Sequence, residues 1–389
     1  MLRLYDTRRR AIVPFRPRSE EVTLYVCGVT PYDTTHLGHA RTFLTFDVLV
    51  RLIELRGKRV RYAQNVTDID ESILQRAARD GVGWRELGRR EEGAFLRDMR
   101  ALGWRRPDVI PHATREMGEI HRLIARLEER GAAYRLPRGM YFSVERARGY
   151  GDLSGLATPR MARLLAGQDD AAMEDPGRRD PRDFALWRFV DSGPTWPSPW
   201  GRGRPGWHIE CSAMALHHLG ERIDLHGGGA DLIYPHHENE IAQTETATGK
   251  RPFVGIWMHV GAMKLERRKM SKSDGNMVFV RDALARTSPE AVRLYLLDVH
   301  YRRPFEHDEP WLARAEQRAE RLAAQLGRGR AALGTDRASR GVMTRLETDL
   351  DTPRALRALE AAARRDPDAK TRASLLAIAR ALGVVPGRG

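Results

Sequence analysis

The sequence predicts an α/β protein with a parallel sheet, because two segments repeat the order strand, turn and helix. The first is the apolar strand 22–27, which a loop joins to apolar residues at helical spacing from about 39 to 55. The second is strand 223–226, which is closed by three glycines. Units of this kind begin many nucleotide-binding domains. The length of 389 residues also exceeds one ordinary core and indicates two to three domains.

The region between these two units changes character along its length. Residues 59–66 are expected to form the next parallel strand, and residues 71 to about 130 have amphipathic helical spacing that breaks near 104–107. From about 133 to 200, a short hairpin-like segment at 140–143 is followed by stretches rich in glycine, proline and aspartate. We interpret this segment as an insertion that splits the sheet domain.

The rest of the chain returns to regular elements. A helical run begins at 206, and strands are expected at 223–226 and 256–259. After residue 301 the pattern is helical, with segments expected at 309–326, at 342–364 with a break at 351–353, and at 371–382. We therefore divide the chain into a first half of the catalytic domain at 1–132, an insertion at 133–200, a second half at 201–260, a linker at 261–307 and a helical bundle at 308–389.

Two short motifs indicate a nucleotide site. His36-Leu37-Gly38-His39 follows the first strand, where a helix N-terminus favours phosphate, and Lys269-Met270-Ser271-Lys272-Ser273 adds two mobile ammonium groups. Only six of the 66 basic residues are lysines, and three of these six lie between 264 and 272. This clustering favours a site that needs compact ammonium groups. A capped turn and a solvated charged loop are the alternatives.

The composition is that of a globular protein with a strong positive charge. The net charge of +14 favours polyanions such as RNA, although an arginine-rich drift in composition would give the same excess. Half of the excess falls in the last 79 residues, which hold sixteen basic and nine acidic side chains. No apolar run approaches eighteen residues and the start lacks a secretory signal, so we expect a cytoplasmic protein without membrane spans.

The two cysteines raise the question of a metal. Cys27 ends the first strand, Cys211 follows a Trp-His pair, and His236 and Glu240 would share one face of a helix. Two thiolates, an imidazole and a carboxylate suit tetrahedral zinc. The spacing is not that of a structural zinc finger, so two buried thiols beside a polar helix cap remain the alternative, and a disulfide is not expected in the cytoplasm.

The motifs resemble the cysteinyl-tRNA synthetase family, a group of class I aminoacyl-tRNA synthetases, over roughly residues 1–310. The matching strings, in family order, are Tyr25-Val-Cys-Gly28, Tyr32-Asp33, His36-Leu-Gly-His-Ala-Arg41, Asn65-Val-Thr-Asp-Ile-Asp70, Asp183-Phe-Ala-Leu-Trp187, Arg204-Pro-Gly-Trp-His-Ile-Glu-Cys211, His226-Gly-Gly-Gly229, Pro235-His-His-Glu-Asn-Glu240 and Lys269-Met-Ser-Lys-Ser273. The resemblance implies a Rossmann-like parallel sheet with an insertion and a C-terminal helical bundle. It also implies activation of L-cysteine with ATP and Mg2+ to cysteinyl-adenylate, followed by transfer to tRNA(Cys).

The resemblance assigns roles to individual residues. It implies one zinc per chain on Cys27, Cys211, His236 and Glu240, which would select the substrate thiol over a hydroxyl without an editing domain. The residues implied for catalysis are His36, His39, Lys269 and Lys272; those for ATP are Thr30, His36, Gly38, His39, Gly229, Asp231 and Lys272; those for cysteine are Gly28, Thr67 and Trp207. For Trp207, core packing is the alternative, and for Asp231 it is a turn cap. The remaining histidines of this region, expected to be structural, are His208, His226, His237 and His259.

Two features depart from this pattern. The loop 29–36 carries proline where the family has valine, which resembles the related cysteine:glucosaminyl-inositol ligase of mycothiol synthesis. No anticodon-binding domain is expected after the bundle, as in that ligase. In contrast, Glu240, Arg41 and the segment 175–187 follow the synthetase. We therefore expect tRNA(Cys) as the acceptor and a monomer, with an amino sugar or another small amine as the alternative and a non-catalytic regulatory paralogue as a remote one.

Overall fold

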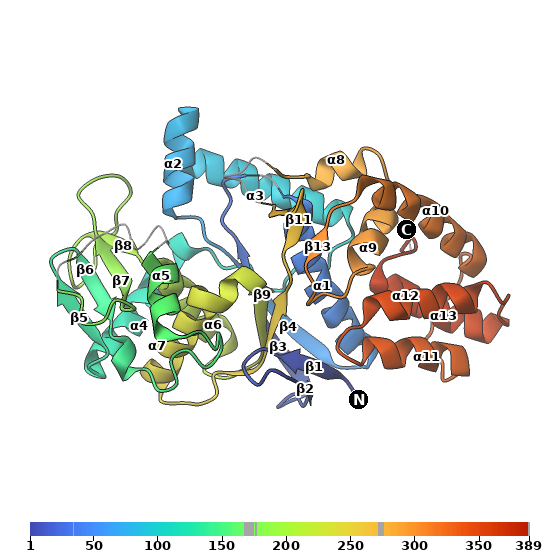
Figure 1. The fold of residues 1–389 in the computed structure, drawn as a ribbon, viewed down its shortest axis with the longest axis horizontal. Coiled ribbons are helices and arrows are strands. Elements are labelled where there is room, and N and C mark those ends of the chain that lie inside the picture. Colours follow the sequence, from blue (N-terminus) through green and yellow to red (C-terminus); the bar gives the residue numbers. More distant parts are fainter. Residues whose placement is uncertain (34, 167–174, 176, 271–275, 388–389) are drawn as a thin grey trace.

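The computed structural model covers the 389-residue chain and describes it except for residues 34, 167–174, 176, 271–275 and 388–389. A central parallel sheet lies between two flanking parts, with an antiparallel sheet at one end of the molecule and a helical bundle at the other (Figure 1). No helix among the described residues is long and apolar enough to cross a membrane.

The central sheet confirms the predicted fold class. Its strands are β3 (Glu21–Val29), β4 (Arg59–Val66), β9 (Ile223–Gly229) and β10 (Val254–Val260), in the order β10-β9-β3-β4. All three pairings are parallel. Strand β3 has β4 as its neighbour on one side and β9 on the other, so the order of the strands reverses at β3. Such a point of reversal is where open α/β sheets bind ligands, outside the carboxyl ends of the strands.

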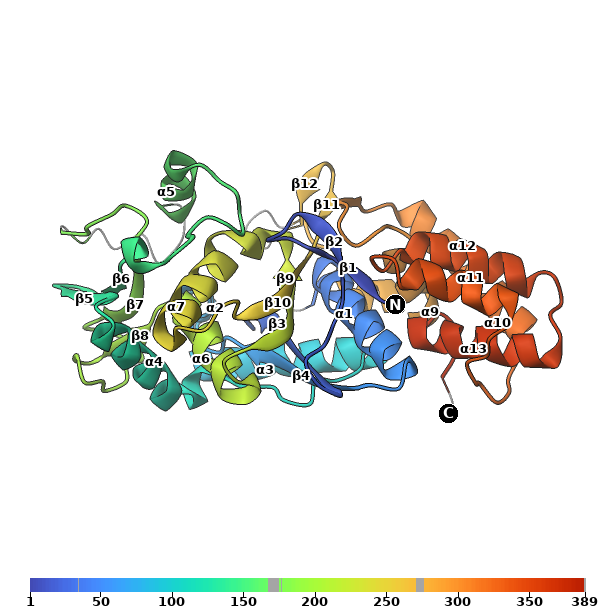
Figure 2. The same cartoon turned by 90° about the horizontal axis from the view of Figure 1, so that it is seen from below.

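Helices cover both faces of this sheet (Figure 2). Helix α1 (Leu37–Leu55) packs on one face, and α6 (Trp207–Leu219) and α7 (Glu238–Thr248) pack on the other. Successive side chains of β3 divide between the two cores, because neighbours in a strand point to opposite faces. Leu24 joins the core with α1, and Tyr25 joins the core with α6 and α7. Both faces of the sheet are therefore dry.

The helical region predicted at 71–130, with one break near 104–107, is three helices rather than two. These are α2 (Glu71–Asp80), α3 (Trp84–Ala101) and α4 (Met117–Glu129). Helix α2 begins where the Asp70 carboxylate accepts from the Ser72 N–H, and it ends at Gly81, whose φ of 66° is left-handed. The region therefore has two breaks. One is the break expected near 104–107, and the other follows the end of α2 at Gly81.

The segment between the halves of the central sheet carries a sheet of its own. Strands β5 (Ala133–Leu136), β6 (Gly139–Phe142), β7 (Phe184–Phe189) and β8 (Gly203–Pro205) are antiparallel in that order. Helix α5 (Thr158–Ala166) lies between β6 and β7 in the chain. The sequence indicated the first hairpin but not β7 and β8. The division of the chain at residues 133 and 200 stays a prediction.

Two small sheets were not predicted. Strands β1 (Arg3–Asp6) and β2 (Ala11–Pro14) form an N-terminal hairpin. The hairpin docks on the edge of β10, where the Trp257 N–H donates to the Asp6 carboxylate at 3.1 Å and the Trp257 carbonyl accepts from Thr7 N at 3.0 Å. The second is a sheet in the order β12-β11-β13, made by β11 (Met263–Leu265), β12 (Arg268–Lys269) and β13 (Phe305–Glu306).

The C-terminal part is helical, as predicted. The bundle and the segment before it contain α8 (Val280–Leu284), α9 (Pro289–Leu297), α10 (Glu309–Leu326), α11 (Arg337–Leu346), α12 (Thr352–Ala363) and α13 (Ala369–Leu382). A buried ion pair joins it to the sheet domain. The guanidinium of Arg293 contacts Asp47 of α1 and donates to the carbonyls of Leu102 and Leu382 at 3.2 and 2.9 Å.

Candidate active site

A pocket of about 300 Å³ opens at the carboxyl ends of the central strands. Segments from five parts of the chain meet there: the end of β3, the start of α1, the start of α6, the loop after β9 and the loop after β10. Among the residues assigned from the sequence, those that line it are Cys27, Gly28, Thr30, His36, Gly38, His39, Trp207, Gly229 and Asp231. The structure thus brings two of the three cysteine candidates and six of the seven ATP candidates into one cavity.

The four candidate metal ligands converge behind the pocket wall. The ligand atoms of Cys27, Cys211, His236 and Glu240 all lie within 4.8 Å of one another. Glu240 Oε1 lies 3.4 Å from the Cys27 sulfur and 3.2 Å from His236 Nε2. The sulfurs of Cys27 and Cys211 are 3.8 Å apart, and both thiols are free. Cys27 comes from β3, Cys211 from α6, His236 from the short segment Ile233–His237 and Glu240 from α7. Four elements therefore bring one side chain each to the same point in the core.

Burial governs the electrostatics of this cluster. Desolvation raises the pKa of the Glu240 carboxyl and of the Cys27 thiol well above their ordinary values. The same desolvation lowers the pKa of His236 well below its ordinary value. Burial therefore favours the neutral forms of the Glu240 carboxyl, the Cys27 thiol and the His236 imidazole when no cation is bound.

A divalent cation fits this arrangement. It would allow the thiols and the carboxyl group to ionise without leaving unpaired buried charge, and two sulfurs, one imidazole and one carboxylate are a donor set suited to zinc.

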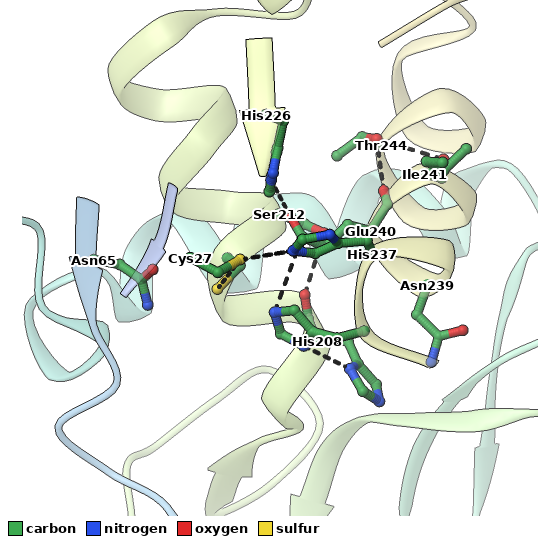
Figure 3. A network of polar contacts seen from close by, with 12 residues as sticks. Cys27, Asn65, His208, Ser212, His226, His237, Asn239, Glu240, Ile241 and Thr244 are labelled. Atoms are coloured by element: carbon green, nitrogen blue, oxygen red, sulfur yellow. Dashed lines mark hydrogen bonds and ion pairs between the residues drawn. The ribbon is translucent and has the colours of Figure 1, made fainter. Parts of the chain in front are cut away.

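Three further histidines, His208, His226 and His237, surround these four residues (Figure 3). His226 Nε2 lies 2.9 Å from Glu240 Oε2, and His208 Nδ1 lies 3.0 Å from His236 Nδ1. Each contact holds a candidate ligand by the atom that faces away from the cluster, which fixes its orientation.

His237 and His259 link the cluster to the N-terminal hairpin. His237 Nε2 lies 3.2 Å from the Cys27 sulfur, and its Nδ1 lies 2.7 Å from Nε2 of His259, a residue of β10. The Nδ1 of His259 lies 2.7 Å from the Thr7 hydroxyl. The sequence analysis regarded these histidines as structural. The adjacency of His236 and His237 was the one available signal that the second imidazole belongs near the site.

The His36-x-Gly38-His39 motif forms a helix cap. His36 Nδ1 accepts from the backbone N–H groups of Gly38 and His39 at 3.1 and 3.3 Å and so caps α1. The rings of His36 and His39 stack with centroids 3.8 Å apart. The sequence analysis expected free N–H groups at this terminus, whereas the structure uses two of them for the cap. A phosphate that took these N–H groups would have to displace the His36 ring.

The candidate cysteine subsite is shaped by close backbone packing. The Gly28 N–H donates to Asn65 Oδ1 at 2.9 Å, and a Cβ at Gly28 would lie 1.7 Å from the Asn65 carbonyl oxygen. Only glycine fits there. The Trp207 ring lies over that of His236 with centroids 4.2 Å apart, so it joins the pocket to the metal cluster. Thr67 is buried, accepts from Asn65 Nδ2 at 3.2 Å and is not among the residues lining the pocket.

The lysine motif is described only in part. Lys269 belongs to β12, and the buried side chain of Met270 lines the pocket. Lys272 lies outside the described residues. The catalytic roles of the two lysines stay predictions.

The family follows from comparison with known proteins. A family model described as the catalytic domain of class I (C) tRNA synthetases matches residues 14–317. The chain belongs to this family. The resemblance drawn from the sequence motifs is therefore confirmed.

Relatives of two kinds are similarly close to this synthetase-family chain. An L-cysteine:1D-myo-inositol 2-amino-2-deoxy-alpha-D-glucopyranoside ligase of Stackebrandtia nassauensis is 46% identical, over 92% of this chain and 84% of the relative. A ligase of the same name from Thermobispora bispora is 45% identical, over 94% and 91%. A cysteine--tRNA ligase of Thermodesulfovibrio yellowstonii is 44% identical, over 84% of this chain and 67% of the relative.

Solved structures support the fold of this synthetase-family chain. Methionyl-tRNA synthetase of Mycobacterium tuberculosis, in complex with methionyl-adenylate, superposes with a TM-score of 0.63 at 19% identity. The match covers 94% of this chain and 90% of that one. At this identity the likeness speaks for the architecture alone.

Proposed function

We propose that the protein activates L-cysteine with ATP to cysteinyl-adenylate and transfers the cysteinyl group to tRNA(Cys). The observation that carries this proposal is the convergence of Cys27, Cys211, His236 and Glu240 beside the pocket at the carboxyl ends of the sheet. Cysteine--tRNA ligases at about 45% identity support the same reading. The family supplies the ATP-dependent reaction class.

Zinc, held by these four residues, would supply a soft Lewis acid that takes a thiolate far more readily than a hydroxyl. The chain's own part is to orient the ligands and to exclude water. His226 and His208 hold Glu240 and His236, and Trp207 covers the cluster on the pocket side. Serine would then be rejected because its hydroxyl is a poor donor to such a site.

Activation needs no nucleophile from the protein. A carboxylate oxygen of cysteine attacks the α-phosphorus of ATP, the bond from that phosphorus to the bridging oxygen breaks, and pyrophosphate leaves with Mg2+. Catalysis is then positioning together with stabilisation of phosphate charge. We assign contact with the triphosphate to His36 and His39, and contact with the adenosine to Thr30, Gly229 and Asp231, all of which line the pocket.

The lysines of the 269–273 motif would act on the leaving pyrophosphate. A lysine ammonium is a compact point charge on a flexible stem, and Lys269 lies in β12 immediately before Met270, which lines the pocket. In the second step a hydroxyl of the terminal ribose attacks the carbonyl carbon of the adenylate, and AMP leaves.

A small amine is the second candidate acceptor, and one observation favours it. The chain aligns with 84% and 91% of the length of two amino-sugar ligases, against 67% for a cysteine--tRNA ligase of similar identity. In that reaction the amine nitrogen would attack the same adenylate carbonyl. Activation is common to both candidates.

One experiment separates the two acceptors. Purified enzyme with cysteine and ATP is offered total tRNA and, in a second reaction, glucosaminyl-inositol, and each acylated product is quantified. We expect cysteinyl-tRNA. A chain that leaves tRNA uncharged and consumes the amino sugar would replace the first proposal by the second. An absence of cysteine-dependent ATP–pyrophosphate exchange would remove both.

A further inference from the structure

A second group of metal-binding side chains lies on the outer surface of the molecule, away from the active-site pocket. His217 and His218 stand near the end of α6, and Glu116 stands immediately before α4. His217 Nδ1 lies 2.8 Å from Glu116 Oε2, and His218 Nε2 lies 2.9 Å from Glu116 Oε1. We propose that these three residues bind a divalent cation of intermediate hardness, such as Ni2+, Cu2+ or Zn2+.

The geometry of the two histidines carries the proposal. Consecutive residues of a helix point about 100° apart, so neighbouring histidines do not converge by default. Here both rings turn toward one carboxylate of another helix, with ring centroids 4.4 Å apart. One ligand atom from each of the three residues lies within 4.8 Å of the others. Two imidazoles and one carboxylate on one side of a cation leave its remaining positions to water.

The two helices hold this group rigidly. Ile120 and Leu123 of α4 and Ala215 and Leu219 of α6 are buried in the same core, and the two helices are in contact. The ligands therefore need no large rearrangement to meet a cation. A site supported by packed helices is better defined than one on loops.

The local charge also suits a cation. Within the described part of the chain, the ion pairs of Glu116 are with His217 and His218, and no lysine or arginine competes for its oxygens. Glu119 adds a second carboxylate, whose Oε1 lies 3.7 Å from His217 Nδ1. This carboxylate is shared with Arg122, so we place it outside the three ligands.

The outer site differs from the core cluster in access. The side chain of His217 is 45% exposed and that of His218 is 19% exposed, whereas Glu240 is fully buried. Cys211 precedes His217 by six residues, which is about 9 Å along the helix axis. The outer site should therefore load and release a cation from solvent while the core cluster keeps its own.

A cation at this site would tie α4 to the far end of the helix that carries Trp207 and Cys211. Ligands that bind only the native state stabilise it by mass action. The inference does not depend on the proposed function, because none of its residues lines the pocket.

The test uses the full-length, untagged protein loaded with zinc in the core and freed of loosely bound metal. Isothermal titration with Ni2+ should show one further ion per chain. His217→Ala and His218→Ala should each weaken binding at least about tenfold, and the double variant should lose it. Glu116→Gln, which keeps the shape of the side chain, should weaken it as well. Cu2+ bound at the site should show electron-spin coupling to two imidazole nitrogens.

His112→Ala is the matched control. His112 Nε2 lies 3.0 Å from Glu92 Oε1, so this pair has the same chemistry with one imidazole. Its loss should leave the Ni2+ isotherm unchanged. The proposal is overturned if zinc-loaded protein binds no further Ni2+, if the double variant binds as well as the parent, or if His112→Ala weakens binding equally.

Discussion

The metal cluster and the nucleotide motifs lie beside one pocket, but they are built in opposite ways. The cluster is buried, and surrounding histidines contact three of its four residues, Cys27, His236 and Glu240. The nucleotide side is made of a helix cap and the start of a loop, and His36 occupies with its own ring the N–H groups that a phosphate would need. Under the proposed function, the difference teaches that selection of the amino acid would be built into the core, whereas phosphate contacts would have to form as ATP binds.

The largest separable effect is expected on the nucleotide side. Lys272→Ala should lower cysteine-dependent ATP–pyrophosphate exchange by about two to three decades, by analogy with removal of one preorganised donor. The zinc content should not change, because Lys272 is not one of the four candidate ligands Cys27, Cys211, His236 and Glu240. Exchange rates and metal analysis of the same preparation check both halves. Unchanged exchange would show that the loop is not catalytic, and loss of zinc would erase the contrast between the two regions.

A smaller effect is expected from the layer around the metal. His226→Phe removes the contact with Glu240 Oε2 and should weaken zinc binding about 10- to 100-fold, the usual cost of losing such a partner. His226→Gln can still donate to that oxygen and should recover part of the affinity. Competition with a chelator of known affinity measures both. Equal losses in the two variants would mean that His226 serves packing alone.

A third prediction concerns how the affinity for zinc depends on pH. Burial raises the pKa of Cys27 and of Glu240 in the metal-free protein, so both groups keep protons that a cation must displace. Affinity should therefore rise with pH, by about tenfold per pH unit for each proton released. Titration calorimetry in buffers of different ionisation enthalpy counts these protons. Binding that releases none would contradict the neutral state inferred for the apo cluster.

The parts that the sequence predicted best are those with a strong local pattern. The apolar run of β3 and the helical spacing of α1 follow from residue periodicity, and both are found within a few residues of the expected bounds. The hairpin strand Arg3–Asp6 was missed because it is short and half charged. Its stability comes from distant partners, since the Tyr5 N–H donates to Asp349, 344 residues away. No local rule contains that contact.

The candidate site divides in the same way. Cys27, Cys211, His236 and Glu240 could be proposed as a set, but four residues spread over four elements converge only once the sheet and its helices are in place. The capping role of the His36 ring was an open alternative in the sequence, and its geometry decides that the cap is formed. The histidines around the cluster had no periodic signal, because burial at that point depends on α6 and α7 packing together.

The central claim is that a core metal selects cysteine, and one paired measurement tests it most directly. Zinc content and amino-acid-dependent ATP–pyrophosphate exchange are determined for the parent protein and for Cys211→Ser, with His112→Ala as a control. We expect one zinc per parent chain with exchange for cysteine and almost none for serine, loss of both zinc and exchange in Cys211→Ser, and no change in the control. Parent protein that activates cysteine without zinc, or a Cys211→Ser variant that keeps both, would contradict the account.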